Sequence, residues 1–249
     1  MPAAGRSRSG KSVNLDRNEL AAGLRDGLAA LGLSIADPQV DALIDYLALL
    51  AKWNAVYNLT AIRDPQAMLV QHLLDSLAIV APLEARAPHG RPAPYPCVVD
   101  VGSGGGLPGI VLAIVWPQAS IHLVEPVGKK AAFLRQCAME LGLGGVRVHA
   151  RRVEELTPWD LASPAGHEVA PAPDLILCRA FASLADFTRG IEALAGPSTI
   201  VAAMKGVHPE HELAELPASW QLAESLGLAV PKLDAERHLL VLRRSPPAP

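Results

Sequence analysis

The sequence predicts an α/β fold: a Rossmann-like, mostly parallel twisted sheet with helices on both faces, preceded by a small N-terminal helical segment. Two observations carry this prediction. Short apolar runs alternate with helical stretches from residue 97 onward, as in βαβ units. A glycine-rich turn directly follows the first of these runs, as in doubly wound α/β proteins. Half of the 249 residues are apolar and 19% are charged, so the chain can bury a core and wholesale disorder is excluded.

The first third of the chain is predicted to be helical. Asp37-Pro38 and Asp64-Pro65 each read as a helix N-cap followed by proline at the first helical position. Apolar residues recur at helical spacing before the first of these signals and after each of them: Leu20, Leu24, Leu28 and Leu31, then Val40, Leu43, Ile44, Leu47 and Leu50, then Met68, Leu69, Leu73, Leu77 and Val80. We therefore expect three helices in this part of the chain.

Strands are predicted after the helical part. Six short apolar runs have the composition of strands: CVVDVG (97–102), SIHLVE (120–125), VRVHA (146–150), DLILC (174–178), STIVAAMK (198–205) and HLLVLR (238–243). Helices over Gly106–Val115 and Gly128–Leu141 separate the first three runs. The last two runs flank WQLAESLGL, so we expect the sheet to end in a hairpin.

Composition shifts divide the chain into segments. Proline-rich and glycine-rich stretches mark boundaries because neither residue continues a helix or a central strand. We expect a disordered basic arm (1–14), a helical segment (15–85), a proline-rich linker (86–96), the α/β domain (97–244) with a loop insertion at 162–173, and a disordered tail (245–249).

The charge balance limits how the chain can meet nucleic acid. Lysine and arginine total 22 against 25 acidic residues, a net charge of −3, so bulk positive charge is excluded and any RNA contact needs a local patch. Five basic residues are candidates for such a patch: Lys129, Lys130, Arg135, Arg151 and Arg152. They are equally compatible with ordinary solvated helix faces.

The three cysteines, Cys97, Cys137 and Cys178, lie too far apart in sequence for a disulfide framework or a zinc pair. His208 and His211 form a close pair without further ligands, so we expect no metal site.

The longest apolar run, Leu107–Trp116, is shorter than the roughly 20 residues of a membrane span. The N-terminus has no apolar signal-peptide core, and we expect a cytoplasmic protein with no membrane segment.

The glycine-rich turn predicts a cofactor site. In VVDVGSGGGLPG (98–109) a strand enters a glycine turn and an apolar helix leaves it, which lets the backbone approach a ligand closely. Glu125 ends the next strand, 23 positions after Gly102, near the spacing of a ribose-binding carboxylate. Strand, turn, helix and acid together favour an adenosine-containing cofactor over a purely structural turn.

The identity of that cofactor depends on the charge near the turn. Gly104, Gly106 and Gly109 match the dinucleotide fingerprint, but Pro108 removes one of the N–H groups that a pyrophosphate needs. Asp100 precedes the turn, and we expect it to give the pocket an acidic rim. Such a rim suits the sulfonium and ammonium groups of S-adenosylmethionine better than a dinucleotide.

A second glycine motif is a false match. Residues 5–12, GRSRSGKS, fit the P-loop pattern, but only four residues precede them, too few for the strand that a P-loop follows. We attribute the match to composition.

Two further segments lie at the predicted carboxyl edge of the sheet. After the third strand, Glu154 is placed to meet an adenine amine, although the residues alone favour a solvated helix start, because such charges usually lie at the surface. After the fourth, Arg179 can bond a base edge or a phosphate and Phe181 can stack on a base or fill the core. Cys178 is interpreted as strand packing rather than as a nucleophile for cytosine.

The chain resembles the RsmG (GidB) family of small-subunit ribosomal RNA guanine-N7 methyltransferases. The resemblance rests on KWN (52–54), YNLTAIRD (57–64), HLLDSL (72–77), DVGSGGGLPGIVLAI, GKKAAFLRQ, RVEEL, CRAFASLADF, MKG (204–206) and ERHLLVL (236–242). It implies a class I methyltransferase fold, S-adenosylmethionine as cofactor and small-subunit ribosomal RNA as partner. It also implies cofactor contacts at Gly102, Leu107, Val153, Glu154 and Arg179, with Glu125 at the position of the family's acid after the second strand. We expect Gly104 of the same turn to bind the cofactor as well.

The implied reaction needs little acid–base chemistry. Guanine N7 has an in-plane lone pair, so attack on a sulfonium methyl depends on alignment and charge placement. Arg179, which is polar and follows an apolar strand, is our candidate catalytic residue. A small-molecule methyltransferase and a non-catalytic RNA-binding ribosome-assembly factor are the alternatives, with a nicotinamide oxidoreductase third. We expect a monomer.

Overall fold

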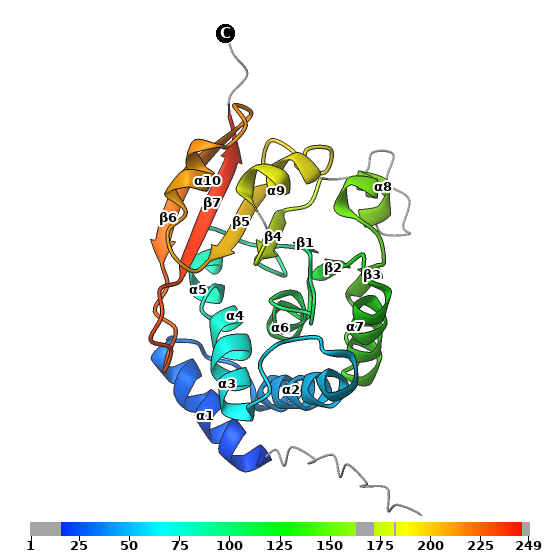
Figure 1. The fold of residues 1–249 in the computed structure, drawn as a ribbon, viewed down its shortest axis with the longest axis vertical. Helices are drawn as coiled ribbons and strands as arrows, with labels where there is room; N and C mark the ends of the chain where they lie inside the picture. Colours follow the sequence, from blue (N-terminus) through cyan, green and yellow to red (C-terminus); the bar gives the residue numbers. More distant parts are fainter. Residues whose placement is uncertain (1–15, 163–171, 182, 246–249) are drawn as a thin grey trace, which may run out of the picture.

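In the computed structural model, residues 16–162, 172–181 and 183–245 are described, and they form one seven-stranded sheet (Figure 1). Its strand order is β3-β2-β1-β4-β5-β7-β6. The first five strands run parallel, and β7 pairs antiparallel with both β5 and β6. The strands are β1 (Cys97–Val101), β2 (Ser120–Val124), β3 (Val146–His149), β4 (Leu175–Arg179), β5 (Ile200–Lys205), β6 (Trp220–Gly227) and β7 (His238–Arg244). The predicted mostly parallel sheet is confirmed.

The strand order reverses between β1 and β4. From β1 the chain runs outward through β2 to β3 and then returns to place β4 on the other side of β1. In register, Val101 of β1 faces Val124 of β2 and Cys178 of β4, so these three strands end side by side. Ligands of doubly wound sheets bind in the crevice outside the carboxyl ends at such a switch point. The fold therefore brings Gly102, Glu125 and Arg179 to one place.

Helices cover both faces of the sheet, as predicted. The N-terminal segment contains α1 (Arg17–Ala30), α2 (Asp37–Tyr57), α3 (Pro65–Met68), the π-helical turn η1 (Leu69–Leu74), α4 (Asp75–Leu77) and α5 (Val80–Glu84). The connections between strands contain α6 (Gly109–Val115), α7 (Gly128–Glu140), the 3₁₀ turn η2 (Val153–Glu155), α8 (Pro158–Leu161), α9 (Leu184–Gly190) and α10 (Glu210–Ala214). Helix α6 begins three residues later than predicted because the glycine turn extends to Pro108.

Two apolar clusters fill the two sides of the sheet. The larger one joins the N-terminal helices, α6 and α7 to the sheet and includes Leu50, Leu73, Leu112 and Leu123. The other packs α9 against the opposite face through Phe187 and its neighbours. The N-terminal segment therefore shares a core with the α/β part, and the Gln39 side chain donates a hydrogen bond to the Ile114 carbonyl, 2.7 Å away.

The proline-rich stretch 86–96 contains no helix or strand. Tyr95 within it is buried, and its hydroxyl donates to the carbonyl of Leu83 at 2.8 Å. Ala93 is buried as well. The stretch is thus fixed to the same core that joins the two parts of the chain.

One of the two predicted helix starts is confirmed. Asp64 caps α3, since its carboxylate accepts a hydrogen bond from the Ala67 N–H at 2.8 Å. Asp37 was expected to cap α2, but the cap is Ala36 and Asp37 is the first helical residue. The Asp37 carboxylate accepts from Arg25 of α1 instead, at 2.8 Å, so it ties two helices together rather than satisfying a backbone N–H.

The two runs expected to close the sheet, β5 and β7, do pair antiparallel, but the hairpin itself is formed by β7 and a further strand that was not predicted. The segment WQLAESLGL forms the edge strand β6, and β6 pairs with β7. Most of its side chains are exposed, and a bulge between Leu222 and Glu224 interrupts the alternation. An exposed edge strand needs no apolar face, which is why periodicity does not reveal it.

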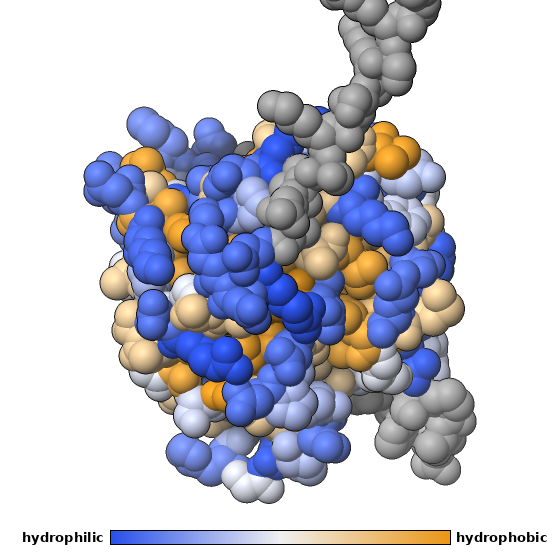
Figure 2. All heavy atoms as spheres, turned by 90° about the horizontal axis from the view of Figure 1, so that it is seen from below, coloured by the Kyte–Doolittle hydropathy of each residue, from blue (hydrophilic) through white to orange (hydrophobic). Residues whose placement is uncertain are grey.

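The helical stretch Pro65–Glu84 has the length and hydropathy of a membrane span, but 67% of its most apolar window is buried in the core. Packing thus accounts for its apolar composition. The outer face of α1 and α2 carries mainly hydrophilic side chains with small apolar patches between them (Figure 2). The arm 1–14 with its P-loop match, most of the insertion 162–173 and residues 246–249 lie outside the described residues.

Candidate active site

The glycine turn after β1 has a backbone that only glycine adopts without strain at three positions. Gly102, Gly104 and Gly106 have φ angles of 72°, 56° and 91°. The N–H groups of Gly102 and Ser103 both donate to the Val124 carbonyl, at 2.9 and 3.1 Å. These bonds fix the turn across the ends of β1 and β2.

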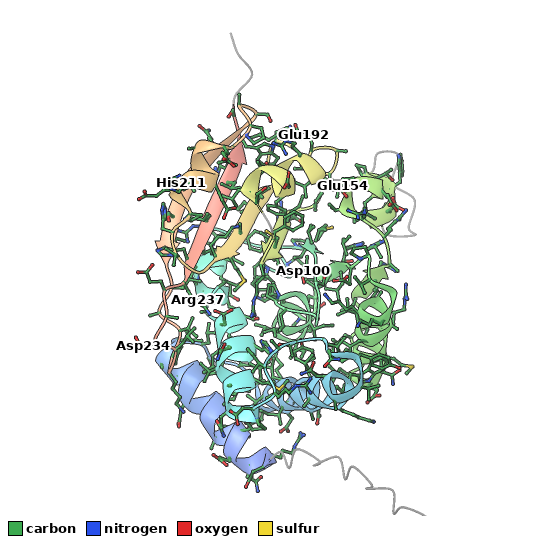
Figure 3. All side chains as sticks on the ribbon, in the orientation of Figure 1. Asp100, Glu154, Glu192, His211, Asp234 and Arg237 are labelled. Carbon is green, nitrogen blue, oxygen red and sulfur yellow. The ribbon has the colours of Figure 1, made fainter. Side chains whose placement is uncertain are left out.

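Asp100 does not form an acidic rim, and that expectation is wrong. Its side chain is fully buried beneath the turn, and Oδ2 accepts a hydrogen bond from the Gly109 N–H at 3.0 Å. A Cβ on Gly109 would lie 2.5 Å from that oxygen, so glycine is required there. Burial raises the pKa of Asp100 to about 7. The carboxyl group holds the start of α6 at the centre of the molecule (Figure 3).

Glu125 lies at the end of β2, next to the turn. Its Oε2 accepts from the Gly104 N–H at 2.9 Å and its Oε1 from the Val127 N–H at 2.8 Å. The carboxylate therefore braces the turn against the start of α7. Each oxygen keeps a second acceptor position, so the ribose contact stays a prediction.

A cavity of about 270 Å³ opens beside the turn, and we call it the glycine-turn cavity. Five residues singled out from the sequence line it: Gly102, Gly104, Leu107, Lys130 and Arg179. The N-terminal segment supplies another wall through Leu50, Leu59, Thr60 and His72. The site is thus shared between the helical segment and the sheet.

His72 and Thr60 are polar wall residues that the sequence analysis assigned no role. The His72 Nε2 lies 3.0 Å from the Thr60 hydroxyl, and the Thr60 N–H donates to the Asn54 side chain at 2.9 Å. Burial and the charge of Arg179 lower the pKa of His72 to about 4, so this imidazole is neutral at physiological pH. In the sequence, the one feature that could have indicated a role for these two residues is that they are polar and have apolar neighbours.

Arg179 ends β4 between two cavities. Its Nη2 donates to the Gln71 carbonyl at 2.9 Å. Its Nη1 lies 3.2 Å from Asp75 Oδ2, within ion-pair range but outside hydrogen-bond geometry. Within the described parts of the chain this buried nitrogen has no hydrogen-bond acceptor. An unsatisfied buried donor is costly and calls for an acceptor on a ligand.

The second cavity, of about 300 Å³, is called the arginine cavity. It is lined by Asp75, Arg179, Ala180, Met204, Lys205, Gly206 and Arg237, and it shares Arg179 and Ala180 with the glycine-turn cavity. Ala180 has a φ of 56°, an unusual value for a residue with a side chain. Strained backbone at the border of two cavities is typical of a binding site.

Val153 and Glu154 do not line the glycine-turn cavity. Val153 is buried in the smaller apolar cluster, whereas Glu154 is exposed beside α9, where a Cβ on Gly190 would lie 3.2 Å from its Oε1. Figure 3 places Glu154 near α8. Their contacts with a cofactor stay predictions.

The five basic candidates fall into two groups. Lys129, Lys130 and Arg135 lie on α7, and Lys129 Nζ donates to the Tyr57 carbonyl at 2.9 Å. Arg151 and Arg152 follow β3, and Arg151 forms an ion pair with Asp160 that offsets its charge. Lys130 alone borders the glycine-turn cavity. A single RNA-binding patch from all five stays a prediction.

Cys178 and Phe181 have packing surroundings. Cys178 is buried in the smaller cluster, and burial raises the pKa of its thiol well above the ordinary range. The Phe181 ring lies 5.5 Å from that of Phe187. These contacts explain both residues without a catalytic role.

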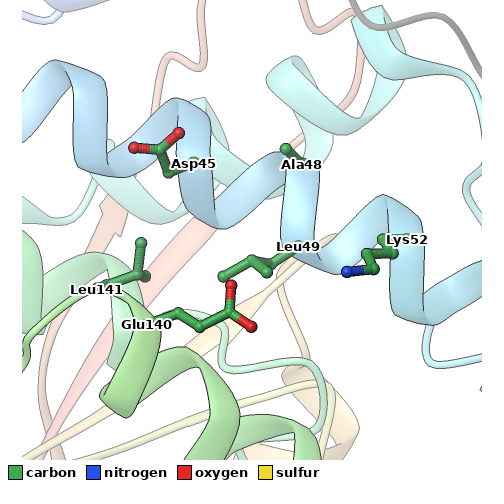
Figure 4. A pocket seen from close by; sticks show the side chains of 6 residues that line it. All are labelled: Asp45, Ala48, Leu49, Lys52, Glu140 and Leu141. Atoms are coloured by element: carbon green, nitrogen blue, oxygen red, sulfur yellow. The ribbon is translucent and has the colours of Figure 1, made fainter.

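Other concave places lie apart from the turn. A cavity of about 250 Å³ between α2 and the end of α7 is lined by Asp45, Ala48, Leu49, Lys52, Glu140 and Leu141 (Figure 4). Among the described residues, no three His, Cys, Asp or Glu side chains are grouped to hold a metal ion.

The sheet, its switch point and the glycine turn define the fold of S-adenosylmethionine-dependent methyltransferases. The O-methyltransferase TomG of Streptomyces achromogenes, solved in complex with SAM, matches 94% of this chain and 100% of its own with a TM-score of 0.52 at 15% identity. MtNAS in complex with MTA and tNA also has a TM-score of 0.52, at 16% identity over 92% of this chain and 86% of that one.

The chain belongs to the GidB family, described as rRNA small subunit methyltransferase G, whose family model matches residues 39–240. The Ribosomal RNA small subunit methyltransferase G of Burkholderia ambifaria is 50% identical over 234 residues, 94% of this chain and 96% of the relative. That of Burkholderia multivorans is 49% identical over the same shares. The resemblance read from the sequence motifs is confirmed.

Proposed function

We propose that the protein transfers the methyl group of S-adenosylmethionine to N7 of a guanine in small-subunit (16S) ribosomal RNA. The observation that carries this proposal is the glycine-turn cavity at the switch point of a chain in this family, bordered by the buried, unsatisfied Nη1 of Arg179.

The residues around the turn suit this cofactor. Gly102 and Gly104 have positive φ angles and no side chains, so a ligand in the cavity can approach their backbone closely. Leu107 adds an apolar contact. We propose that Glu125 binds the ribose and that Val153 and Glu154 meet the adenine. When bound, S-adenosylmethionine supplies a methyl group made electrophilic by its sulfonium.

The chain's own contribution to the reaction is positioning. Guanine N7 needs no deprotonation before it attacks, which fits a cavity whose imidazole, His72, has its pKa lowered to about 4 and is therefore a weak base. We propose that Arg179 acts as the catalytic residue by orienting the base and the cofactor from its place between the cavities. Alignment and fixed charge supply the rate enhancement.

The RNA must present its base in an accessible form. N7 lies on the major-groove edge, which side chains cannot reach in an A-form helix, so the guanine comes from a loop, a bulge or a flipped position. Lys129, Lys130, Arg135, Arg151 and Arg152 are the proposed phosphate contacts. We further propose that the protein acts as a monomer in the cytoplasm, on the small ribosomal subunit or its RNA, without a metal or a membrane.

The test is to map N7-methylguanosine in small-subunit ribosomal RNA from cells with and without the gene for this protein. We expect one guanine to lose its N7-methyl group in the deletion strain and to regain it on complementation. Unchanged methylation would overturn the proposal and favour an assembly factor or a small-molecule methyltransferase.

A further inference from the structure

We propose that the arginine cavity is the site of the target guanine and that Asp75 reads the Watson–Crick edge of this base. The inference rests on the proposed function and adds the specificity-determining residue. It begins from the position of the cavity, which shares Arg179 and Ala180 with the glycine-turn cavity. A base in one cavity therefore adjoins a cofactor in the other.

Asp75 has the acceptor capacity that such a role needs. Its side chain is 3% exposed, and its Oδ1 accepts from Arg237 Nε at 2.7 Å while Oδ2 faces Arg179 Nη1 at 3.2 Å. A carboxylate offers about four acceptor positions. Arg237 takes one of them and the Arg179 contact lies outside hydrogen-bond geometry, so about three are left for a ligand, on a nearly buried carboxylate where a hydrogen bond discriminates strongly.

Guanine matches this arrangement edge by edge. Its N1–H and 2-amino group are neighbouring donors on the Watson–Crick edge, whereas N7 and O6 are acceptors on the other edge. With the two donors on the Asp75 carboxylate, N7 is turned away from Asp75 and toward the neighbouring cavity. The unsatisfied Nη1 of Arg179 is free to donate to O6, which leaves the N7 lone pair for the methyl group.

The π-helical turn η1 explains how one helical stretch places side chains in both cavities. His72 lies within it and lines the glycine-turn cavity, while Asp75 follows it directly and lines the arginine cavity. Local π-helical turns are frequent at functional sites. Arg237, which precedes β7 and is labelled in Figure 3, donates to the Asp75 carboxylate and is a positioning residue.

The same cavity suits a phosphate less well. Of its three cationic residues, Lys205 is engaged by both oxygens of Glu212, at 2.7 and 2.9 Å, and by the Phe181 carbonyl at 3.3 Å. Asp75 lies between the other two and would repel an anion. A neutral base with paired donors fits where a phosphate does not.

The test compares two substrates that differ by one amino group. Small subunits are reconstituted with guanine or with hypoxanthine at the mapped position, and single-turnover transfer of labelled methyl is measured. Hypoxanthine lacks the 2-amino group, so a buried acceptor of Asp75 is left unpaired and the wild-type rate is expected to fall about tenfold. A wild-type ratio near one overturns this inference alone, whereas wild-type protein that labels neither substrate overturns the proposed function with it.

Asp75→Asn tests the residue. The amide turns a donor toward the guanine 2-amino group, so we expect about tenfold slower transfer to guanine and a guanine-to-hypoxanthine ratio near one. Asp174→Asn is the matched control, because Asp174 likewise accepts from an arginine, Arg91, but lies at the opposite edge of the sheet. It is expected to keep the wild-type ratio.

A folded Asp75→Asn protein that still prefers guanine about tenfold contradicts the proposal, since a merely structural role would leave the ratio unchanged. Should this variant unfold, Asp75→Glu is measured instead. The longer side chain displaces the carboxylate, so its ratio is expected to fall well below that of the wild type, and an unchanged ratio counts against Asp75.

Discussion

The two edges of the sheet carry cavities that differ in size and in polar chemistry. The amino edge has the larger one, about 580 Å³, with Arg91, Cys97 and Asp174 in its wall, against about 270 and 300 Å³ at the carboxyl edge. At the amino edge the Asp174 carboxylate is already engaged, by Arg91 and by the Cys97 N–H at 2.9 Å. At the carboxyl edge a guanidinium nitrogen of Arg179 is buried without an acceptor among the described residues.

This difference teaches that cavity volume does not locate the site. At the carboxyl ends of parallel strands the chain turns sharply, and here Gly102, Gly104 and Gly105 line the cavity. The polar groups at that edge, Glu125 and Arg179, are held in place by protein contacts but can still form hydrogen bonds with a ligand. The amino edge is roomy, yet its carboxylate is satisfied within the protein.

The largest expected effect on activity comes from a comparison of Arg179 with Arg91, since each contacts an aspartate in a cavity wall. Arg179→Ala should slow single-turnover methyl transfer to undermethylated small subunits by about a hundredfold, because positioning between the cavities is lost. Arg91→Ala at the amino edge should stay within about twofold of wild type. Thermal melting checks the fold of each variant. Equal losses in both would remove the distinction between the edges.

A matched pair of glycines tests the turn. Gly102→Val should weaken S-adenosylmethionine binding at least about tenfold in calorimetry, because a side chain covers backbone that the cofactor approaches and strains a φ of 72°. Gly142 has a φ of 64° and open space around it, away from the cavity, so Gly142→Val carries the same strain. It should melt lower by a similar amount and bind normally. Normal binding by Gly102→Val would place the cofactor elsewhere.

Cysteines at the two edges should both be dispensable for chemistry. Cys178→Ser should keep methyl transfer within about threefold while costing about 1–3 kcal/mol of stability, since a hydroxyl replaces a buried apolar thiol. Cys97→Ser is the control at the amino edge. A folded, inactive Cys178→Ser beside an active Arg179→Ala would indicate covalent pyrimidine chemistry and overturn the guanine assignment.

The smallest effect on activity is expected at His122, whose Nε2 lies 3.1 Å from the Ser120 hydroxyl at the amino end of β2. Burial lowers the pKa of His122 to about 4 in the folded protein, from the ordinary histidine value of about 6.5. Below pH 6.5 the unfolded chain binds more protons, so stability is lost as the pH falls through this window.

Urea unfolding at pH 7.5 and pH 5 measures that loss. His122→Gln should lose about 2 kcal/mol less than wild type between these values and should transfer methyl groups normally. An identical pH dependence in the two proteins would mean that His122 is not buried neutral.

The sequence predicts what is local and leaves out what distant segments build. The strand, glycine turn and helix after residue 97 follow from spacing along one stretch of chain, and so does Arg179 at the end of an apolar strand. Asp75 and Arg237 are 162 positions apart, and only the folded chain shows that they meet.

Burial explains the remaining differences. An aspartate just before the glycine turn can either face a ligand or bond the start of the next helix, and the sequence is the same in both cases. Periodicity does not show on which side of the turn the Asp100 side chain lies. The edge strand β6 lacks an apolar face, so its pairing with β7 is visible only in the sheet. His72 likewise lines the glycine-turn cavity only because the helical segment packs against the turn.

The most direct test of the carboxyl-edge site is the set of backbone amide shifts in two-dimensional NMR as S-adenosylmethionine is added to the isotope-labelled protein. The account predicts large shifts at Gly102, Gly104 and Leu107, with Ser120 and Gly145 at the amino-edge cavity unchanged. Shifts confined to Ser120 and Gly145 would place the cofactor in the larger cavity and contradict the account.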